Sequence, residues 1–287
     1  MDDYFEITQV FVEQEIKSLE QKLKNQPRNG KLRRSLINAY RKKGDIAMVI
    51  KNLQALKETP KFFTQYYQSL YSILSQEEHC IDARGVSPVP YRLFENVFKR
   101  SFIDSLWEEI RNKRDLFTNS EVYSTDGGAV DKTVRDSQCL YKKSIGDELK
   151  MCFLDEITRL YKNVESFFCR NSALLCPREL ELNVYRRGVG FVRHTDAGSQ
   201  DGMDTREITF LYYFYQDPKA FAGGDLALFD TNRKQGDCGV GFSRINITNN
   251  SLLFFPSDCW HQVTQLKSAG ESFYSGRFTL NGWFHSK

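Results

Sequence analysis

A succession of short, aromatic-rich segments near the C-terminal end limits the folds open to this chain more than any other feature. β-branched and aromatic residues favour strands, and glycine-rich breaks at Gly223-Gly224 and at 236–241 separate the segments. The predicted strands cover residues 180–185, 207–215, 225–229, 251–255, 261–266 and 275–284. Because no helical pattern alternates with them, they favour a double-sheet jelly roll over a parallel α/β sheet.

Residues 1–83 have a different pattern, with apolar residues at helical spacing. Residues 31–56 predict a helical hairpin that turns at Gly44-Asp45 and ends before Pro60. This hairpin resembles one tetratricopeptide repeat in Tyr40, in the glycine at its turn and in the closing proline. We therefore expect N-terminal α-helical hairpins to precede the β domain.

The whole chain is predicted to be an α+β protein with two domains. A helical, tetratricopeptide-like segment covers residues 1–83, and the second domain covers residues 84–287, with its core at 180–284. The proline-containing stretch 84–90 interrupts helical periodicity and marks the boundary. Helices at 101–111 and 148–168 support the β core, and the polar stretch 118–134 predicts a loop.

Composition excludes several classes of protein. The net charge of +3 is too small to indicate a nucleic-acid partner, and the basic clusters of the helical segment fit a solvated helix face. The longest apolar runs, 210–215 and 252–255, are too short to span a bilayer. Seven cysteines with no Cys-x-x-Cys pair indicate reduced thiols, and the chain opens without a signal-peptide pattern. We expect a cytoplasmic protein without membrane contact.

Two histidines and a carboxylate have the pattern of a metal site. His194 and Asp196 follow a glycine-broken aromatic strand, and alternate side chains of an extended strand share a face. His261 stands at the edge of another apolar strand. Two histidines and one carboxylate on one face of a metal are the ligands of non-haem Fe(II) oxygenases, although the same set also suits zinc.

The last predicted strand carries an arginine that needs an anion. Alternation places Arg277, Thr279, Asn281 and Trp283 on one face of this strand. A buried arginine is costly unless an anion meets it. The far carboxylate of a dicarboxylate such as 2-oxoglutarate would supply one, because a guanidinium can bind it bidentately.

Residues 180–284 resemble the prolyl-hydroxylase-type 2-oxoglutarate/Fe(II)-dependent dioxygenases. Four segments match in order, namely Tyr185 to Asp196 with its Gly-x-Gly-Phe and His-x-Asp, 206–213, 223–229 and 253–263 followed by Arg277. The resemblance implies a double-stranded β-helix in which His194, Asp196 and His261 hold Fe(II). It further implies that Arg277 binds the distal carboxylate of 2-oxoglutarate, with hydrogen bonds from Tyr213 and from Thr279 or Tyr185.

The activity implied by this resemblance is hydroxylation of an unactivated C–H bond by O₂, with succinate and CO₂ as coproducts and ascorbate as an accessory reductant. We expect a prolyl or other residue of a protein or peptide as the substrate. The N-terminal helices would help to present it, as in the similar arrangement of collagen-type prolyl hydroxylases. A small-molecule hydroxylase, acting on a free amino acid or a natural product, is the alternative of the same chemistry.

Two alternative functions from other classes of protein stay open. The chain could be a helical-repeat interaction protein with an inactive oxygenase-like domain, which would bind neither iron nor 2-oxoglutarate. A zinc hydrolase on the same three ligands would leave Arg277 unexplained. One departure from the family is an expanded turn between His261 and Arg277, which contains Lys267 as a weaker candidate for the carboxylate contact.

Overall fold

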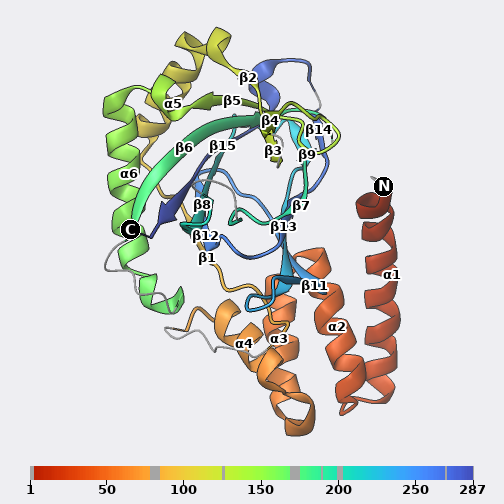
Figure 1. The fold of residues 1–287 in the computed structure, drawn as a ribbon. Coiled ribbons are helices and arrows are strands. Elements are labelled where there is room, and N and C mark those ends of the chain that lie inside the picture. The colour runs from red at the N-terminus through yellow and green to blue at the C-terminus, as the bar shows by residue number, and fades with distance from the viewer. Residues whose placement is uncertain are drawn as a thin grey trace. The chain divides into compact units, whose positions relative to one another are not determined.

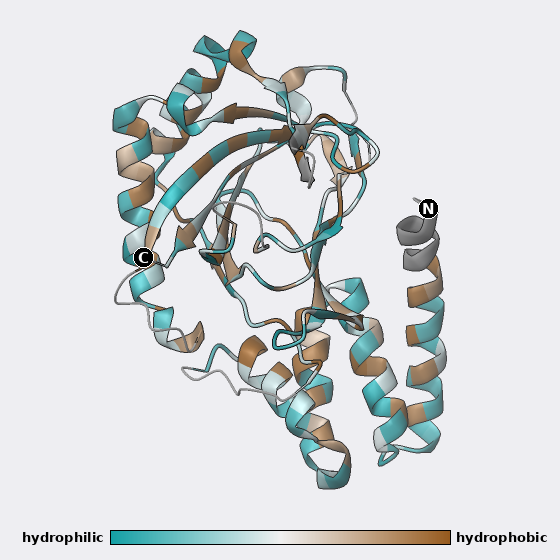
Figure 2. Cartoon of the chain, viewed as in Figure 1, coloured by the Kyte–Doolittle hydropathy of each residue, from teal (hydrophilic) through white to brown (hydrophobic). Residues whose placement is uncertain are grey.

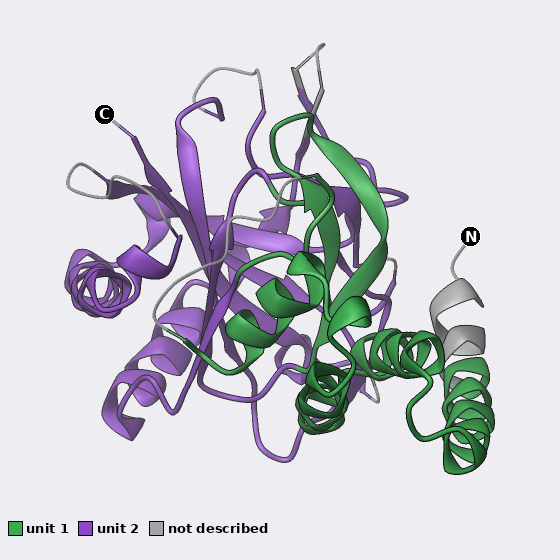
Figure 3. Cartoon of the chain, turned by 90° about the horizontal axis from the view of Figure 1, so that it is seen from below, with its two compact units in different colours: residues 1–90, 226–246, 259–261 green, residues 91–225, 247–258, 262–287 purple. Residues whose placement is uncertain are grey.

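The structure, a computed structural model, describes residues 3–77, 85–124, 127–168, 175–188, 190–198, 203–268 and 270–286 (Figure 1). Its mixture of N-terminal helices and antiparallel strands confirms the predicted α+β class. The chain divides into two compact units (Figure 3). Unit 1 comprises residues 1–90, 226–246 and 259–261, and unit 2 comprises residues 91–225, 247–258 and 262–287. The predicted boundary near residue 84 stays a prediction.

Unit 1 combines the N-terminal helices with a β-hairpin from the second half of the chain. Its elements are α1 (Asp3–Asn25), α2 (Gly30–Lys43), α3 (Ile46–Lys57), η1 (Pro60–Phe62), α4 (Gln65–Leu74), β10 (Leu226–Asn232) and β11 (Asp237–Ile245). The predicted helical hairpin is present as α2 and α3. Gly44 ends α2 in the left-handed conformation, with φ of 81°, and the side chain of Asp45 caps α3 by accepting a hydrogen bond from the Met48 amide at 3.1 Å.

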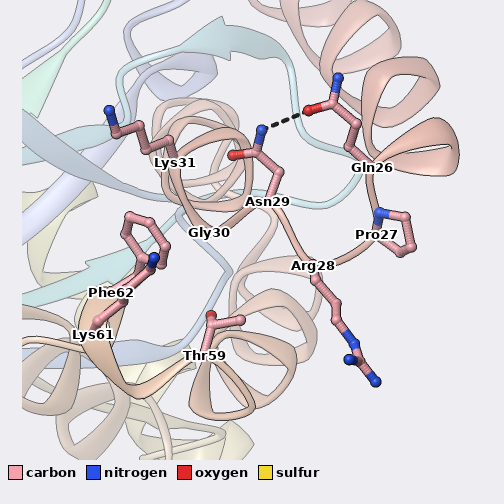
Figure 4. Close-up of a pocket in the computed structure, with 9 residues that line it drawn as sticks. All are labelled: Gln26, Pro27, Arg28, Asn29, Gly30, Lys31, Thr59, Lys61 and Phe62. Carbon is pink, nitrogen blue, oxygen red and sulfur yellow. Dashed lines mark hydrogen bonds between the residues drawn. The ribbon is translucent and has the colours of Figure 1, made fainter.

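An open pocket of about 560 Å³ lies beside the turn between α1 and α2, and Figure 4 shows the residues that line it. Asn29 caps α2 through the Leu32 amide and donates a hydrogen bond to Gln26 at 2.7 Å. Gly30 is required here, because a Cβ at this position would lie 2.2 Å from the ring of Phe62. The residues that line this pocket include no histidine, cysteine or carboxylate that could bind a metal.

Unit 2 contains the other elements. They are β1 (Arg92–Glu95), α5 (Arg100–Asn112), η2 (Arg114–Leu116), β2 (Thr118–Asn119), β3 (Val122–Ser124), β4 (Gly127–Ala129), β5 (Gln138–Tyr141), η3 (Lys142–Ser144), α6 (Asp147–Lys162), η4 (Glu165–Phe168), β6 (Cys176–Tyr185), β7 (Phe191–His194), β8 (Arg206–Phe214), β9 (Phe221–Gly223), β12 (Ser251–Pro256), β14 (Leu266–Ser268), η6 (Phe273–Ser275) and β15 (Arg277–His285). Strand β13 (His261–Val263) begins with the last residue of unit 1 and continues into unit 2.

A seven-stranded sheet in the order β1-β12-β8-β15-β6-β5-β2 forms the frame of unit 2, and its neighbouring strands run antiparallel. Hydrophobic and hydrophilic residues alternate along β6 (Figure 2). Helices α5 and α6 cover one face, where Trp107 makes edge contacts with Phe214 and Phe278, and Phe153 packs near Tyr212. The residues that alternate with these aromatics lie on the opposite face.

A second sheet has the order β11-β10-β13-β7, and the two sheets make the jelly-roll-like domain that the strand pattern predicts. The sequence analysis treated the glycine-rich stretch after residue 236 as a break, and this was wrong, because it forms β11. Glycines are needed in this strand, since a Cβ at Gly241 would lie 2.2 Å from Asp230 Oδ2. The predicted loop at 118–134 was also wrong in part, because it contains β2 and the β3–β4 hairpin.

No helix among the described residues combines the length and the apolar character needed to cross a bilayer.

Candidate functional site

Three potential metal ligands lie together in the structure. His194 is the last residue of β7, Asp196 follows two residues later, and His261 is the first residue of β13. Each offers one ligand atom, and these atoms all lie within 4.8 Å of one another. Two imidazole nitrogens and one carboxylate oxygen fit the donor preferences of Fe(II) or Zn(II).

Both histidines are oriented by backbone carbonyls. His194 Nδ1 lies 2.7 Å from the Val192 carbonyl oxygen, and His261 Nδ1 lies 3.0 Å from the Cys259 carbonyl oxygen. A carbonyl can only accept a hydrogen bond, so Nδ1 carries a proton in each ring, and in the neutral ring Nε2 then carries the lone pair. This is the usual arrangement of a histidine that binds a metal through Nε2.

Two hydroxyl-bearing residues, Thr209 and Ser257, fix the position of Asp196. Thr209 on β8 donates a hydrogen bond to Asp196 Oδ2 at 2.7 Å, and its hydroxyl lies 3.0 Å from that of Ser257. The backbone amide of Asp196 donates to the Ser257 carbonyl at 2.9 Å. The other carboxylate oxygen, Oδ1, lies 3.6 Å from His194 Nε2. Asp196 therefore presents one oxygen toward the histidines while the other is fixed.

Replacing Thr209 with valine should weaken metal binding with little change in shape. The variant removes the hydrogen bond to Asp196 Oδ2, and the loss of such an outer contact costs roughly 10–100-fold in metal affinity. A Co(II) absorbance titration measures the change. Thr158→Val is the matched control, because the Thr158 hydroxyl bonds to the Leu154 carbonyl within α6. Equal Co(II) affinity in Thr209→Val and wild type would contradict this role.

Arg277, the first residue of β15, is a buried guanidinium that has no acidic partner. Its relative exposure is 1%, and one of its nitrogens donates to the Gly224 carbonyl. Its guanidinium carbon lies 4.5 Å from the ring centroid of Tyr185 and 5.4 Å from that of Tyr213. Among the described residues no carboxylate forms an ion pair with it, and its Nε is buried without a hydrogen bond. Burial lowers the pKa of Arg277.

Tyr213 on β8 has a buried hydroxyl that also lacks a hydrogen-bond partner among the described residues. Burial raises the pKa of Tyr213, so the hydroxyl stays protonated at neutral pH and can donate. Tyr213 is paired in register with Thr279 on β15, and Tyr185 on β6 is paired with Arg277. A buried cation and an unused donor on one sheet face fit a carboxylate ligand.

The four residues predicted to bind the cosubstrate therefore lie on one face of the seven-stranded sheet. Thr279 donates a 3.4 Å hydrogen bond to Asn281, and Tyr185 stacks on Arg277. Thr209 and Tyr213 share this face of β8 and lie roughly 14 Å apart along the strand. The sequence analysis missed Thr209 and Ser257. Thr209 could have been found, because it lies four residues before Tyr213 in the predicted strand 207–215 and therefore on the same face.

Comparison with known proteins identifies relatives for this part of the chain. Residues 180–285 match the model of the 2OG-Fe(II) oxygenase superfamily. An uncharacterised PKHD-type hydroxylase of Synechocystis sp. is 42% identical over 111 residues, which cover 38% of this chain and 36% of the relative. The prolyl 3,4-dihydroxylase OGFOD1 of Ostreococcus tauri is 23% identical over 217 residues, which cover 71% of this chain and 39% of the relative. The chain thus spans less than two fifths of the length of each of these curated relatives.

Among solved structures, the fold is similar to that of a Trichoplax adhaerens prolyl hydroxylase in complex with a peptide fragment of the hypoxia-inducible factor oxygen degradation domain. The TM-score is 0.50 at 17% sequence identity, and the match covers 68% of this chain and 83% of the other. At this identity the likeness concerns the fold alone.

Proposed function

From the match of residues 180–285 to the model of the 2OG-Fe(II) oxygenase superfamily, we propose that the chain is an Fe(II)- and 2-oxoglutarate-dependent dioxygenase that hydroxylates a C–H bond of a polypeptide. The metal ligands in this proposal are His194, Asp196 and His261, the three residues whose ligand atoms lie within 4.8 Å of one another. When bound, the iron and 2-oxoglutarate supply the oxidising chemistry, with O₂ consumed and succinate and CO₂ released.

The observation that carries the proposal is the buried, unpaired guanidinium of Arg277. A charge that is 1% exposed and has no carboxylate partner among the described residues is costly unless a ligand neutralises it. A ligand carboxylate would relieve this cost and would also satisfy the Tyr213 hydroxyl. The zinc-hydrolase alternative leaves this buried cation unexplained, so Arg277 favours the oxygenase over the hydrolase.

The residues of the chain have separate tasks in this proposal. Arg277 binds the distal carboxylate of 2-oxoglutarate, Tyr213 donates a hydrogen bond to the cosubstrate, and Tyr185 and Thr279 line the same face. Thr209 holds Asp196 so that one carboxylate oxygen faces the metal. The aromatic packing of α5 and α6 on the other sheet face keeps the strands in place behind these groups.

Replacing Tyr213 with phenylalanine should lower the affinity for 2-oxoglutarate roughly 10–100-fold, since a hydrogen bond to a charged group is worth about 1.5–3 kcal/mol. Isothermal titration of the Co(II)-loaded protein with 2-oxoglutarate measures it. Tyr212→Phe is the control, because the neighbouring hydroxyl bonds to Asn250 on the opposite sheet face. Unchanged affinity in Tyr213→Phe, or an equal loss in both variants, would argue against a contact with the cosubstrate.

The polypeptide substrate is supported by the relatives. One is named a prolyl 3,4-dihydroxylase, and a solved structure of similar fold holds a peptide. We propose a prolyl or another residue of a protein as the hydroxylated group, with ascorbate as an accessory reductant. Presentation of the polypeptide by the N-terminal helices and a cytoplasmic location both stay predictions.

The test is a succinate-release assay with Fe(II), ascorbate and 2-oxoglutarate, run with proline-containing peptide libraries and, separately, with free amino acids. Release stimulated by peptides, together with a mass increase of one oxygen on the peptide, is the expected result. Stimulation by free amino acids alone would replace the polypeptide substrate with a small molecule. Absence of any succinate, with or without substrate, would favour an inactive interaction protein.

A further inference from the structure

Unit 1 contains a buried ion pair that joins an N-terminal helix to the β10–β11 hairpin. Arg41 of α2 and Asp230 of β10 have side-chain exposures of 1% and 4%. Arg41 Nη2 donates to Asp230 Oδ1 at 2.6 Å, and Nη1 donates to Oδ2 at 3.2 Å. The Asp230 carboxylate raises the pKa of Arg41 against the opposing effect of burial, so the arginine stays charged.

Two hydroxyls complete the network around this pair. The Tyr66 hydroxyl of α4 donates to Asp230 Oδ2 at 2.6 Å and accepts from Arg41 Nη1. The Ser243 hydroxyl of β11 accepts from Arg41 Nε at 3.0 Å. Both helices and both strands of the hairpin therefore contribute a polar group. A buried charge pair is costly unless its hydrogen bonds are satisfied, and a fully satisfied network makes the elements that it joins more rigid. Here it joins β10 to α2, α4 and β11.

The residues on either side of Asp230 hold the backbone that leads into His261. The Phe229 amide donates to the Trp260 carbonyl at 2.9 Å, and the Trp260 amide donates to the Thr231 hydroxyl at 3.2 Å. The indole of Trp260 donates to the Gly236 carbonyl, in the turn that follows β10, at 2.7 Å. Trp260 is thus fixed to β10 on both sides of Asp230, and the next residue is His261.

We propose that Arg41, Tyr66 and Asp230 are positioning residues for His261, so that the N-terminal helices serve as a structural support of the metal site. The proposal rests on the proposed function of His261 as a metal ligand. The chain of contacts runs from α2 and α4 to Asp230, from its neighbours Phe229 and Thr231 to Trp260, and so to the histidine. Every residue in this chain belongs to unit 1 (Figure 3).

The test compares Co(II) binding in full-length variants by the intensity and position of the d–d absorption bands. Tyr66→Phe removes one hydrogen bond from the network and keeps the ion pair. The double variant Arg41→Met with Asp230→Leu replaces the pair with apolar side chains, a change that often preserves stability. We expect about tenfold weaker Co(II) binding in the double variant, with shifted bands, and a smaller loss in Tyr66→Phe.

Arg33→Met is the matched control, since Arg33 lies on the same helix and its hydrogen bonds go to Asn52 and to the Pro27 carbonyl, both within the N-terminal helices. This variant should lose stability without a change in Co(II) affinity or spectrum. Tyr66→Phe decides the question if the double variant does not fold. If wild type binds Co(II) and the network variants bind it as tightly and with the same bands, the positioning role is overturned while the proposed function stands. If wild type itself binds no Co(II), the proposed function fails.

Discussion

Replacing Asp196 with alanine should abolish binding of Fe(II) and its substitute Co(II) at micromolar concentrations, together with all succinate release. Asp196 supplies the one anionic ligand of the set, so its loss should exceed the roughly 100-fold upper range seen for outer contacts. Isothermal titration with Co(II) measures the affinity, and circular dichroism checks that the fold persists.

Asp204→Ala is the matched control, because this exposed carboxylate lies eight residues further along the chain. It should bind Co(II) like wild type. If Asp196→Ala also retained wild-type Co(II) affinity, the metal would have to be bound elsewhere and the assignment of His194, Asp196 and His261 would fall.

Replacing Arg277 with methionine should remove binding of 2-oxoglutarate while leaving metal binding intact. The guanidinium meets no carboxylate among the described residues, so its partner in this account is the ligand. Truncating one member of a buried charge pair costs about 2–5 kcal/mol, which corresponds to a loss of affinity of roughly 30-fold to several thousand-fold. Arg277→Lys keeps the charge without the bidentate fork and should show an intermediate loss.

Thermal denaturation offers a second test of 2-oxoglutarate binding by Arg277→Met. At 100 times its Kd, 2-oxoglutarate stabilises a protein by about 2.7 kcal/mol, and this stabilisation should be present in wild type and absent in Arg277→Met. Arg92→Met is the control, since Arg92 is also buried in the seven-stranded sheet, against the ring of Phe167. Stabilisation of Arg277→Met by 2-oxoglutarate to the wild-type extent would show that another cation, such as Lys267, binds the carboxylate.

The two variants test metal binding and 2-oxoglutarate binding separately. Asp196→Ala should lose the metal, and with it the chelated cosubstrate, whereas Arg277→Met should lose only the cosubstrate. A site that merely maintained the fold would show neither pattern. The comparison therefore distinguishes a site that binds iron and 2-oxoglutarate from a domain that has kept the same residues but binds neither.

Local periodicity was enough to predict much of this arrangement. His194 ends a strand and Asp196 follows two residues later, and Arg277 and Thr279 alternate along another strand, so the sequence spacing indicated that the members of each pair lie close together. The hairpin of α2 and α3 followed from helical spacing and from the glycine at its turn. These features depend on residues that are close in the chain.

Contacts between residues far apart in the chain could not be predicted from local sequence patterns. Arg41 and Asp230 are 189 positions apart, and nothing near either residue signals that they meet. The buried position of Asp230 also explains why β11 was missed. The glycines of this strand resemble a break in the sequence, but in the structure they leave room for the Asp230 carboxylate beside the strand. The support of Asp196 by Ser257 likewise joins the segment after β7 to the residue after β12, which are far apart in the chain and meet only in the folded protein.

The most direct test of the central claim is an anaerobic titration of the metal-free protein with Fe(II) and 2-oxoglutarate, followed by visible absorption. The account predicts a weak, saturable charge-transfer band that requires both components, is absent in Asp196→Ala and needs much more 2-oxoglutarate in Arg277→Met. A wild-type protein that binds zinc tightly, or no metal, and gives no band with Fe(II) and 2-oxoglutarate would contradict it.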